Sequence, residues 1–366
     1  MNSSVTVAAT TPYEVRVESA LDLSEAISSA VPLDDPEGGK AVLLTDSNVG
    51  PLHAPSVTDA LRRAGWDLLD TVTVPAGEGS KSLSVYEGVL RNLAAAGLPR
   101  GGTLFALGGG VVGDLGGFVA SSYMRGIDLV QLPTSLLAMV DSSVGGKVGL
   151  DLPEGKNLVG AFLQPRLVAA NLDWLETLST REVSQGLAEV VKMGLLAGGE
   201  FFEALQRLEA ARAGYSDALQ ALILHSVRYK ASVVAEDERE TGLRSILNYG
   251  HTIGHGLEAA ASYGLPHGEA IAAGMLAASR LGFEKLGADL LETHEDLLQA
   301  ANLPQKVPAV PIETVLAAMG RDKKRRSSDV PDEYRFVLLR DVGEPERYVS
   351  VTASEARRAI EAVLGS

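Results

Sequence analysis

Apolar and polar positions along the first half of the chain follow two alternating patterns. Short apolar runs that end in polar residues or glycine predict strands at 41–46, 68–74, 103–107 and 129–132. Between them, apolar residues at helical spacing predict helices over 57–65 and 81–97. Strands that alternate with helices are typical of βαβ units, so we expect an α/β domain with a mostly parallel sheet.

From about residue 178 the pattern changes to alanine- and leucine-rich segments with helical spacing. It predicts helices at 182–197, 201–213, 217–235, 250–261 and 268–286. A strand-like stretch at 334–339 predicts a small hairpin near the C-terminus. We therefore expect an α/β domain over 13–180 and a helical domain over 181–366, preceded by a disordered segment over 1–12.

Composition narrows the class of protein. The chain has 366 residues and a net charge of -15, which argues against a nucleic-acid partner and an anionic membrane surface. It contains no cysteine, which excludes disulfides, thiolate metal sites and cysteine nucleophiles. The first twelve residues lack the pattern of a signal peptide, and no apolar run reaches membrane-spanning length. A cytoplasmic enzyme is therefore expected.

Three of the six histidines lie within seventeen residues. His251 and His255 are four apart, so on a helix both rings project from one face, and His267 follows a short Gly-Leu-Pro turn. Two or three neutral imidazoles with a carboxylate suit a catalytic divalent metal, although core histidines bonded to the backbone are the alternative. Glu189 could complete the set. It precedes Lys192 by three residues among apolar neighbours, which favours a buried pair over a surface ion pair.

A glycine-rich segment at 108–114 follows a predicted strand and opens a helix. It matches G-x-G-x-x-G, a pattern in which backbone N–H groups and the positive helix end bind a pyrophosphate. A lone match is weak, this one does not follow the first strand, and the glycines could serve tight packing alone. Polar residues on two other loops strengthen the dinucleotide interpretation. They are Asp46 with Asn48, and Glu78 with Lys81.

Cationic side chains gather beside these motifs although the chain is acidic overall. They suit a substrate that bears phosphate and carboxylate groups. They are Arg125, Lys147, Lys156, Lys230 and Arg244. Val148 follows Lys147 where a P-loop requires Ser or Thr, so we exclude nucleotide triphosphate hydrolysis. The basic run at 323–326 is expected to be a solvated loop.

Taken together, these segments resemble the 3-dehydroquinate synthase family of sugar-phosphate cyclases. The resemblance extends from about residue 41 to 343 and is carried by the motifs at 108–114, 141–147, 155–157, 188–192, 247–255 and 267–270. It implies an NAD-binding α/β domain followed by an all-α metal- and substrate-binding domain, tightly bound NAD, Zn²⁺ or Co²⁺, and a homodimer. The implied reaction converts 3-deoxy-D-arabino-heptulosonate 7-phosphate to 3-dehydroquinate and phosphate, a step of the shikimate pathway. Its stages are transient oxidation by NAD, phosphate elimination, re-reduction, ring opening and intramolecular aldol closure.

The resemblance also implies roles for individual residues. The metal ligands would be Glu189, His251 and His267, which leaves His255 for proton transfer. The other catalytic and substrate-binding residues would be Lys147, Asn157, Lys192, Lys230, Glu240, Arg244, Asn248 and one or both of Lys323 and Lys324, with Arg125 reaching the phosphate from a second subunit. The cofactor-binding residues would be Asp46, Asn48, Glu78, Lys81, Gly110, Val111, Val112, Gly113, Asp114, Thr134, Ser135, Asp141, Lys147, Lys156, Thr177, Leu178 and Glu182.

The chain departs from the family pattern without losing a catalytic group. Ser135 replaces a threonine, Val148 and Asp151 stand where threonine and asparagine are commoner, and Ser179 replaces a proline at the domain junction. Other functions stay open at this stage. A metal-dependent alcohol or glycerol dehydrogenase would share the architecture but has no need for so many cations. A sibling cyclase would act on a related sugar phosphate, and an inactive binding module would bind metal and NAD without turnover.

Overall fold

The computed structural model describes residues 3–33, 39–214, 216–262, 264–320 and 333–365. The chain divides into two compact units, Met1–Leu178 with Lys230–Arg239, and Ser179–Tyr229 with Glu240–Ser366. The division after Leu178 lies within three residues of the domain boundary after residue 180 that the sequence predicted. The return of Lys230–Arg239 to the first unit was not expected.

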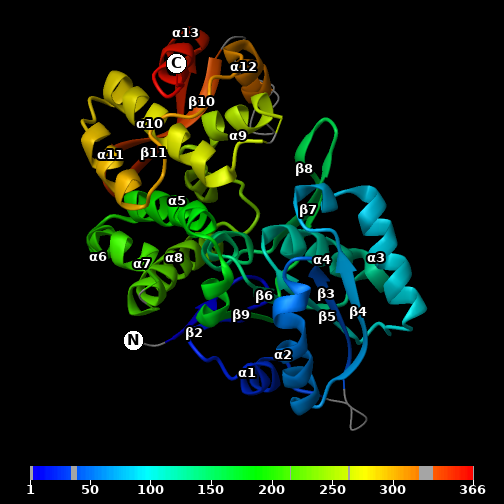
Figure 1. Ribbon diagram of the computed structural model, residues 1–366. Helices are drawn as coiled ribbons and strands as arrows, with labels where there is room; N and C mark the ends of the chain where they lie inside the picture. Colours follow the sequence, from blue (N-terminus) through cyan, green and yellow to red (C-terminus); the bar gives the residue numbers. More distant parts are fainter. Residues whose placement is uncertain (1–2, 34–38, 215, 263, 321–332, 366) are drawn as a thin grey trace. The chain divides into compact units, whose positions relative to one another are not determined.

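A seven-stranded sheet forms the centre of the first unit, in the order β1-β2-β9-β6-β5-β3-β4 within the described residues (Figure 1). Neighbouring strands are parallel except for β1, which is antiparallel to β2. The mostly parallel sheet is thus confirmed, whereas the expectation of disorder over 1–12 was wrong for residues 4–7, which form β1. The strands are β1 (Ser4–Val7), β2 (Tyr13–Glu18), β3 (Lys40–Asp46), β4 (Asp67–Val74), β5 (Thr103–Gly108), β6 (Asp128–Pro133) and β9 (Leu167–Asn171).

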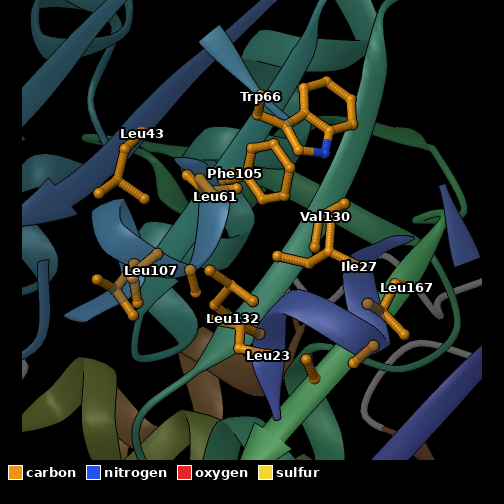
Figure 2. Packing of buried hydrophobic residues seen from close by; sticks show 14 of the residues in the cluster. Leu23, Ile27, Leu43, Leu61, Trp66, Phe105, Leu107, Val130, Leu132 and Leu167 are labelled. Carbon is orange, nitrogen blue, oxygen red and sulfur yellow. The ribbon is translucent and has the colours of Figure 1, made fainter. Parts of the chain in front are cut away.

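Successive residues of the central strands point to opposite faces of this sheet, and each face is covered by helices. On one face, strand residues that include Leu43 and Phe105 pack with α1 (Leu23–Ala30) and α2 (Gly50–Arg63) (Figure 2). On the other, the neighbouring residues that include Leu44 and Leu104 pack with α3 (Leu83–Ala95) and α4 (Gly110–Ser122). This burial on both sides explains why the strands read as continuous apolar runs.

Further short elements complete the first unit. A hairpin that the sequence analysis did not predict is formed by β7 (Lys147–Leu152) and β8 (Gly155–Phe162). The short helical turns are η1 (Glu78–Ser80), η2 (Tyr123–Arg125), η3 (Ala138–Ser142) and η4 (Leu172–Thr177).

The second unit is mainly helical, as expected. Its helices are α5 (Thr180–Ala197), α6 (Gly199–Ala204), η5 (Leu205–Arg207), α7 (Leu208–Arg212), α8 (Ser216–Glu236), η6 (Leu243–Asn248), α9 (His251–Ala260), α10 (His267–Leu286), α11 (Leu291–Ala300), α12 (Ile312–Gly320) and α13 (Ala353–Glu361). The residues of α8 from Lys230 onward belong to the first unit. The single helix predicted over 201–213 is instead the series α6, η5 and α7. The predicted C-terminal hairpin is present as β10 (Glu333–Asp341) and β11 (Glu344–Thr352). Among the described residues, no helix combines the length and apolar character needed to cross a membrane.

Candidate functional site

The polar residues proposed to bind a nucleotide lie at the carboxyl ends of parallel strands in the first unit. Asp46 ends β3, the segment Gly108–Gly110 joins β5 to α4, and Thr134 with Ser135 follows β6. From β3 the chain continues through α2 on one face of the sheet, and from β5 through α4 on the other. Adjacent strands whose connections leave on opposite faces open a crevice at their carboxyl ends, which is where ligands bind in open α/β sheets.

The start of α4 is suited to an anion. Its N-cap is Gly109, and no side chain caps the helix, so the first-turn N–H groups are left to other acceptors. A Cβ added at Gly110 would lie 2.9 Å from the Ser142 hydroxyl oxygen, so glycine there allows close approach to η3. The segment thus has the helix-terminus geometry that the glycine motif predicted, with Val111, Val112 and Gly113 in its first turn.

Lys81 joins several elements of the first unit through its ammonium group. Its Nζ lies 2.8 Å from Asp114 on α4 and 2.6 Å from the side-chain oxygen of Asn157 on β8. It lies 3.6 Å from Glu78 and 3.8 Å from Asp151, whose carboxylate also accepts the backbone N–H of Asn157. Burial lowers the pKa of Lys81, but the surrounding carboxylates outweigh it and the net shift is upward. Lys81 therefore stays charged and ties the turn after β4 to α4 and the β7–β8 hairpin.

Other residues proposed for the cofactor or substrate occupy several places in the first unit. Asp46 Oδ1 accepts the N–H groups of Asn48 and Val49 and so caps the turn into α2. Asp141 on η3 accepts from Lys230 on α8 at 2.6 Å. Asn48, Lys147 and Arg125 are exposed, and Arg125 lies in η2. Lys156 Nζ lies 3.7 Å from Glu78. Thr177 ends η4 and Leu178 follows it, with the Thr177 hydroxyl 3.3 Å from His53 Nε2.

The second unit brings together the three residues proposed as metal ligands. Glu189 is fully buried on α5, and one of its carboxylate oxygens, Oε1, lies 3.4 Å from His251 Nε2 and 3.2 Å from His267 Nε2. One donor atom from each residue falls within 4.8 Å of the other two. Two imidazoles and a carboxylate are a common donor set for Zn²⁺ in catalytic sites, so these residues fit a divalent metal. Lys192 pairs with the other carboxylate oxygen of Glu189, which confirms that the two share one face of a buried helix.

The outer nitrogen of each candidate imidazole ligand faces an acceptor. His251 Nδ1 lies 3.0 Å from the carbonyl oxygen of Tyr249. His267 Nδ1 lies 3.4 Å from a carboxylate oxygen of Glu258. A proton on Nδ1 in both rings leaves Nε2 with a lone pair directed toward Glu189, which is the arrangement that a metal ligand requires.

Burial and charge set the protonation of this cluster. Burial alone raises the pKa of Glu189, but Lys192 and the two imidazoles outweigh it and hold that pKa well below its ordinary value. Burial, with Lys192 nearby, lowers the pKa of His251. Burial also opposes the charged form of His267, but hydrogen bonds to Glu189 and Glu258 outweigh it and raise the pKa of His267 to about 10. A metal ion that binds here would therefore displace a proton from His267.

Glycines bring the two histidine-bearing helices into backbone contact. Gly250, at φ 76°, precedes α9, and a Cβ there would lie 3.1 Å from the backbone nitrogen of Met275 on α10. A Cβ at Gly274 on α10 would lie 2.9 Å from the carbonyl carbon of Gly250 and 3.0 Å from the nitrogen of Gly254. Gly250 and Gly254 thus face α10, while His251 and His255, each one residue further on, are turned toward the metal set.

The remaining residues proposed for the second unit occupy defined positions. His255 is exposed on α9, with its ring centroid 5.0 Å from that of His251. Arg244 is 1% exposed in η6, and Asn248 donates to Glu240 at 2.8 Å. Glu182 forms a capping box with Ser179 at the start of α5. Lys323 and Lys324 lie outside the described residues.

Sequence reasoning missed three residues that contact these clusters. Glu258 follows His255 by three positions and His251 by seven, so helical spacing could have placed it on their face. Asp151 was noted only as a departure from the family pattern, yet it joins the Lys81 cluster. His294 is fully buried, with Nε2 2.7 Å from the Tyr249 hydroxyl oxygen, so it supports the loop before His251.

Comparisons with known proteins agree on one family. The family models for the N-terminal and C-terminal parts of 3-dehydroquinate synthase match residues 71–185 and 186–325. The 3-dehydroquinate synthase of Xylella fastidiosa (strain 9a5c) is 43% identical over 368 residues, covering 98% of this chain and 91% of that protein.

Solved structures of other sugar-phosphate cyclases have a similar fold. A 2-deoxy-scyllo-inosose synthase complexed with carbaglucose-6-phosphate, NAD+ and Co2+ superposes with a TM-score of 0.89 at 28% identity, covering 99% of this chain and 100% of that one. The 2-epi-5-epi-valiolone synthase of Streptomyces hygroscopicus subsp. jinggangensis, with NAD+ and Zn2+ bound, gives 0.83 at 25% identity and 96% coverage of both chains. With more than two thirds of the chain matched at over 40% identity, the protein belongs to the 3-dehydroquinate synthase family.

Proposed function

We propose that this chain is a phosphate-eliminating carbon–oxygen lyase that uses NAD and a divalent metal. Its substrate would be 3-deoxy-D-arabino-heptulosonate 7-phosphate, and its products 3-dehydroquinate and phosphate. The observation that carries the proposal is the set of Glu189, His251 and His267, whose donor atoms lie within 4.8 Å of one another in a chain so similar to 3-dehydroquinate synthases. The cyclases of similar structure that contain NAD+ with Co2+ or Zn2+ support the same cofactors here.

Residues of the second unit would hold and orient the metal. When bound, the metal ion would polarise a substrate hydroxyl, and NAD would accept a hydride and later return it. Lys192 offsets the charge of Glu189 on the side away from the imidazoles. The carbonyl oxygen of Tyr249 keeps the Nδ1 proton on His251. His255, exposed beside the metal set, is the proposed carrier of a substrate proton.

Residues of the first unit would bind the cofactor and the anionic groups. The glycines at the start of α4 would admit the pyrophosphate of NAD, and Asp46 would lie near its ribose hydroxyls. Arg125 would bind the substrate phosphate from a second subunit, so we propose a homodimer. The location we propose is the cytoplasm, since NAD and phosphorylated sugars are intracellular metabolites.

The test follows phosphate release and absorbance at 340 nm with catalytic NAD and each of two substrates. The proposal expects phosphate release from the heptulosonate phosphate, formation of 3-dehydroquinate, and no accumulation of NADH. Release from glucose 6-phosphate instead would indicate a sibling cyclase. Steady NADH formation without phosphate would indicate a dehydrogenase, and either outcome would refute the proposal.

A further inference from the structure

Glu258 places a buried carboxylate beside the proposed metal set. It lies on α9 seven residues after His251, so helical geometry turns it to the same side as that histidine. Its exposure is 2%, and Oε2 lies 3.4 Å from His267 Nδ1. A carboxylate with so little access to water is costly unless hydrogen bonds or opposite charge compensate it. Its position therefore calls for a partner such as the His267 ring.

The ring of His267 faces a carboxylate on each side. Nε2 lies 3.2 Å from Glu189 Oε1, and Nδ1 faces Glu258. A neutral imidazole carries one proton, and a metal can bind only the nitrogen without it. If Nε2 is the ligand atom, the proton must be on Nδ1, where Glu258 can accept it.

The other imidazole ligand meets the same requirement by different means. His251 Nδ1 faces the backbone carbonyl of Tyr249, which no side-chain substitution removes directly. The acceptor for His267 is a side chain, so mutation can test it. A negatively charged acceptor also strengthens the ligand more than a neutral carbonyl does, because it makes the imidazole more basic.

We propose that Glu258 is a positioning residue of the metal site. Its carboxylate accepts the Nδ1–H of His267, selects the tautomer with a lone pair on Nε2, and holds the ring toward Glu189. This inference rests on the proposed metal-dependent function. It adds a residue that acts through a ligand and touches neither substrate nor ion.

The same residues allow a competing arrangement that an experiment can separate. Donor atoms of His255, Glu258 and His267 also lie within 4.8 Å of one another. If Glu258 were itself a ligand, the protein would take up a second cation, and His267 would bind through Nδ1. The number of bound ions therefore distinguishes an orienting carboxylate from a ligand.

The experiment measures Zn²⁺ affinity of chelator-treated full-length protein by competition with a chromophoric chelator, and the visible absorption of the Co²⁺ form. The variants are Glu258→Ala and Glu258→Gln, with Glu269→Gln as the matched control. Glu269 is two residues from His267, but its carboxylate accepts from Arg181 at 2.7 Å and from Gln185 at 3.3 Å, not from the ring. Thermal unfolding of each metal-free variant verifies that it folds.

We expect Glu258→Ala to lose about 10- to 100-fold in Zn²⁺ affinity, the usual effect of removing an outer partner of a ligand. Its Co²⁺ spectrum should also change. Glu258→Gln keeps an acceptor oxygen and should retain most of the affinity, and Glu269→Gln should stay within about twofold of the unmodified protein, because it leaves the Nδ1 contact intact.

Several results would overturn the inference. These are Glu258→Ala with unchanged affinity and spectrum, Glu258→Gln as weak as Glu258→Ala, Glu269→Gln as weak as either, or loss of a second bound ion in Glu258→Ala. If the unmodified protein binds zinc but forms no dehydroquinate, the proposed reaction fails while the role of Glu258 stands. If it binds no zinc, both fail.

Discussion

Substitution of Gly274 by alanine tests whether backbone contact between α9 and α10 holds the metal ligands in place. The new methyl group would lie 2.9 Å from the carbonyl carbon of Gly250, 3.0 Å from the nitrogen of Gly254, and closer still to the Gly250 oxygen. Ordinary contact begins at 3.4 Å, so these atoms must withdraw. The methyl also intrudes on the hydrogen bond from Gly254 N–H to the Gly250 carbonyl, the first of α9.

The magnitude follows from three opposing effects. Overpacking against backbone costs about 1–3 kcal/mol. Weakening one hydrogen bond costs about 1 kcal/mol, and the better helix propensity of alanine returns about 1 kcal/mol. We expect a net loss of about 1–3 kcal/mol, or a fall in Tm of about 2–12 °C for a unit of this size. Displacement of α9 also moves His251, and since ligands must be held within about 0.5 Å, Zn²⁺ affinity should fall at least about tenfold.

The control is the same substitution in another helix. A Cβ added at Gly88 on α3 meets no atom within 4 Å, so Gly88→Ala should stabilise the protein by about 0.5–1 kcal/mol. The measurements are thermal unfolding and zinc competition for both variants. The reasoning is refuted if Gly274→Ala is as stable as the unmodified protein and binds zinc equally well.

Three further predictions concern other groups. Burial lowers the pKa of His294 to about 4, so on acidification the unfolded chain binds this proton before the folded chain does. The free energy of unfolding should therefore fall by about 3 kcal/mol as the pH drops from about 6.5 toward 4. Urea unfolding of His294→Leu should show less of this loss, and an identical pH dependence would contradict the prediction. Lys81→Met leaves the carboxylates around it without a compensating charge. The free energy of unfolding should fall by about 2–3 kcal/mol, less than for a fully buried pair because Asp114 is partly exposed, and NAD should bind more weakly. Equilibrium unfolding and NAD titration check this, and unchanged values would count against it. Arg125 is exposed, so Arg125→Ala should leave Tm unchanged. It should raise KM about 10- to 100-fold, because the proposed contact with the substrate phosphate is lost. Steady-state kinetics measure this, and a normal KM would exclude the phosphate role.

The sheet of the first unit was largely predictable because its central strands are buried on both faces. Apolar runs such as Leu43–Leu44 leave little ambiguity when turn residues bound them. The β7–β8 hairpin was not predicted, since both strands contain glycine and β8 has no buried residue to mark it as an apolar run. A long-range hydrogen bond from the Asp151 N–H to the Lys81 carbonyl supports it. The single helix predicted over 201–213 was wrong because the spacing of apolar residues does not show where the backbone changes from α to 3-10 geometry.

The metal set was predictable because histidine spacing and a family motif both point to it. The environment of Lys81 was not, because its ammonium was expected to face a ligand from a turn, yet its partners Asp114 and Asn157 lie 33 and 76 residues away in the chain. Glu258 was visible in the spacing, but its importance depends on the orientation of the His267 ring, which only tertiary structure provides.

The most direct test of the central claim titrates Zn²⁺ into chelator-treated protein and measures phosphate release from the heptulosonate phosphate with catalytic NAD. The unmodified protein and His267→Ala are compared, with bound zinc measured in each sample. The proposed site predicts that activity rises with bound zinc up to one ion per chain and then levels off, with no NADH accumulating, while His267→Ala neither retains zinc tightly nor releases phosphate. Phosphate release that survives chelation, or near-normal turnover by His267→Ala, would contradict the assignment of Glu189, His251 and His267 as the metal centre.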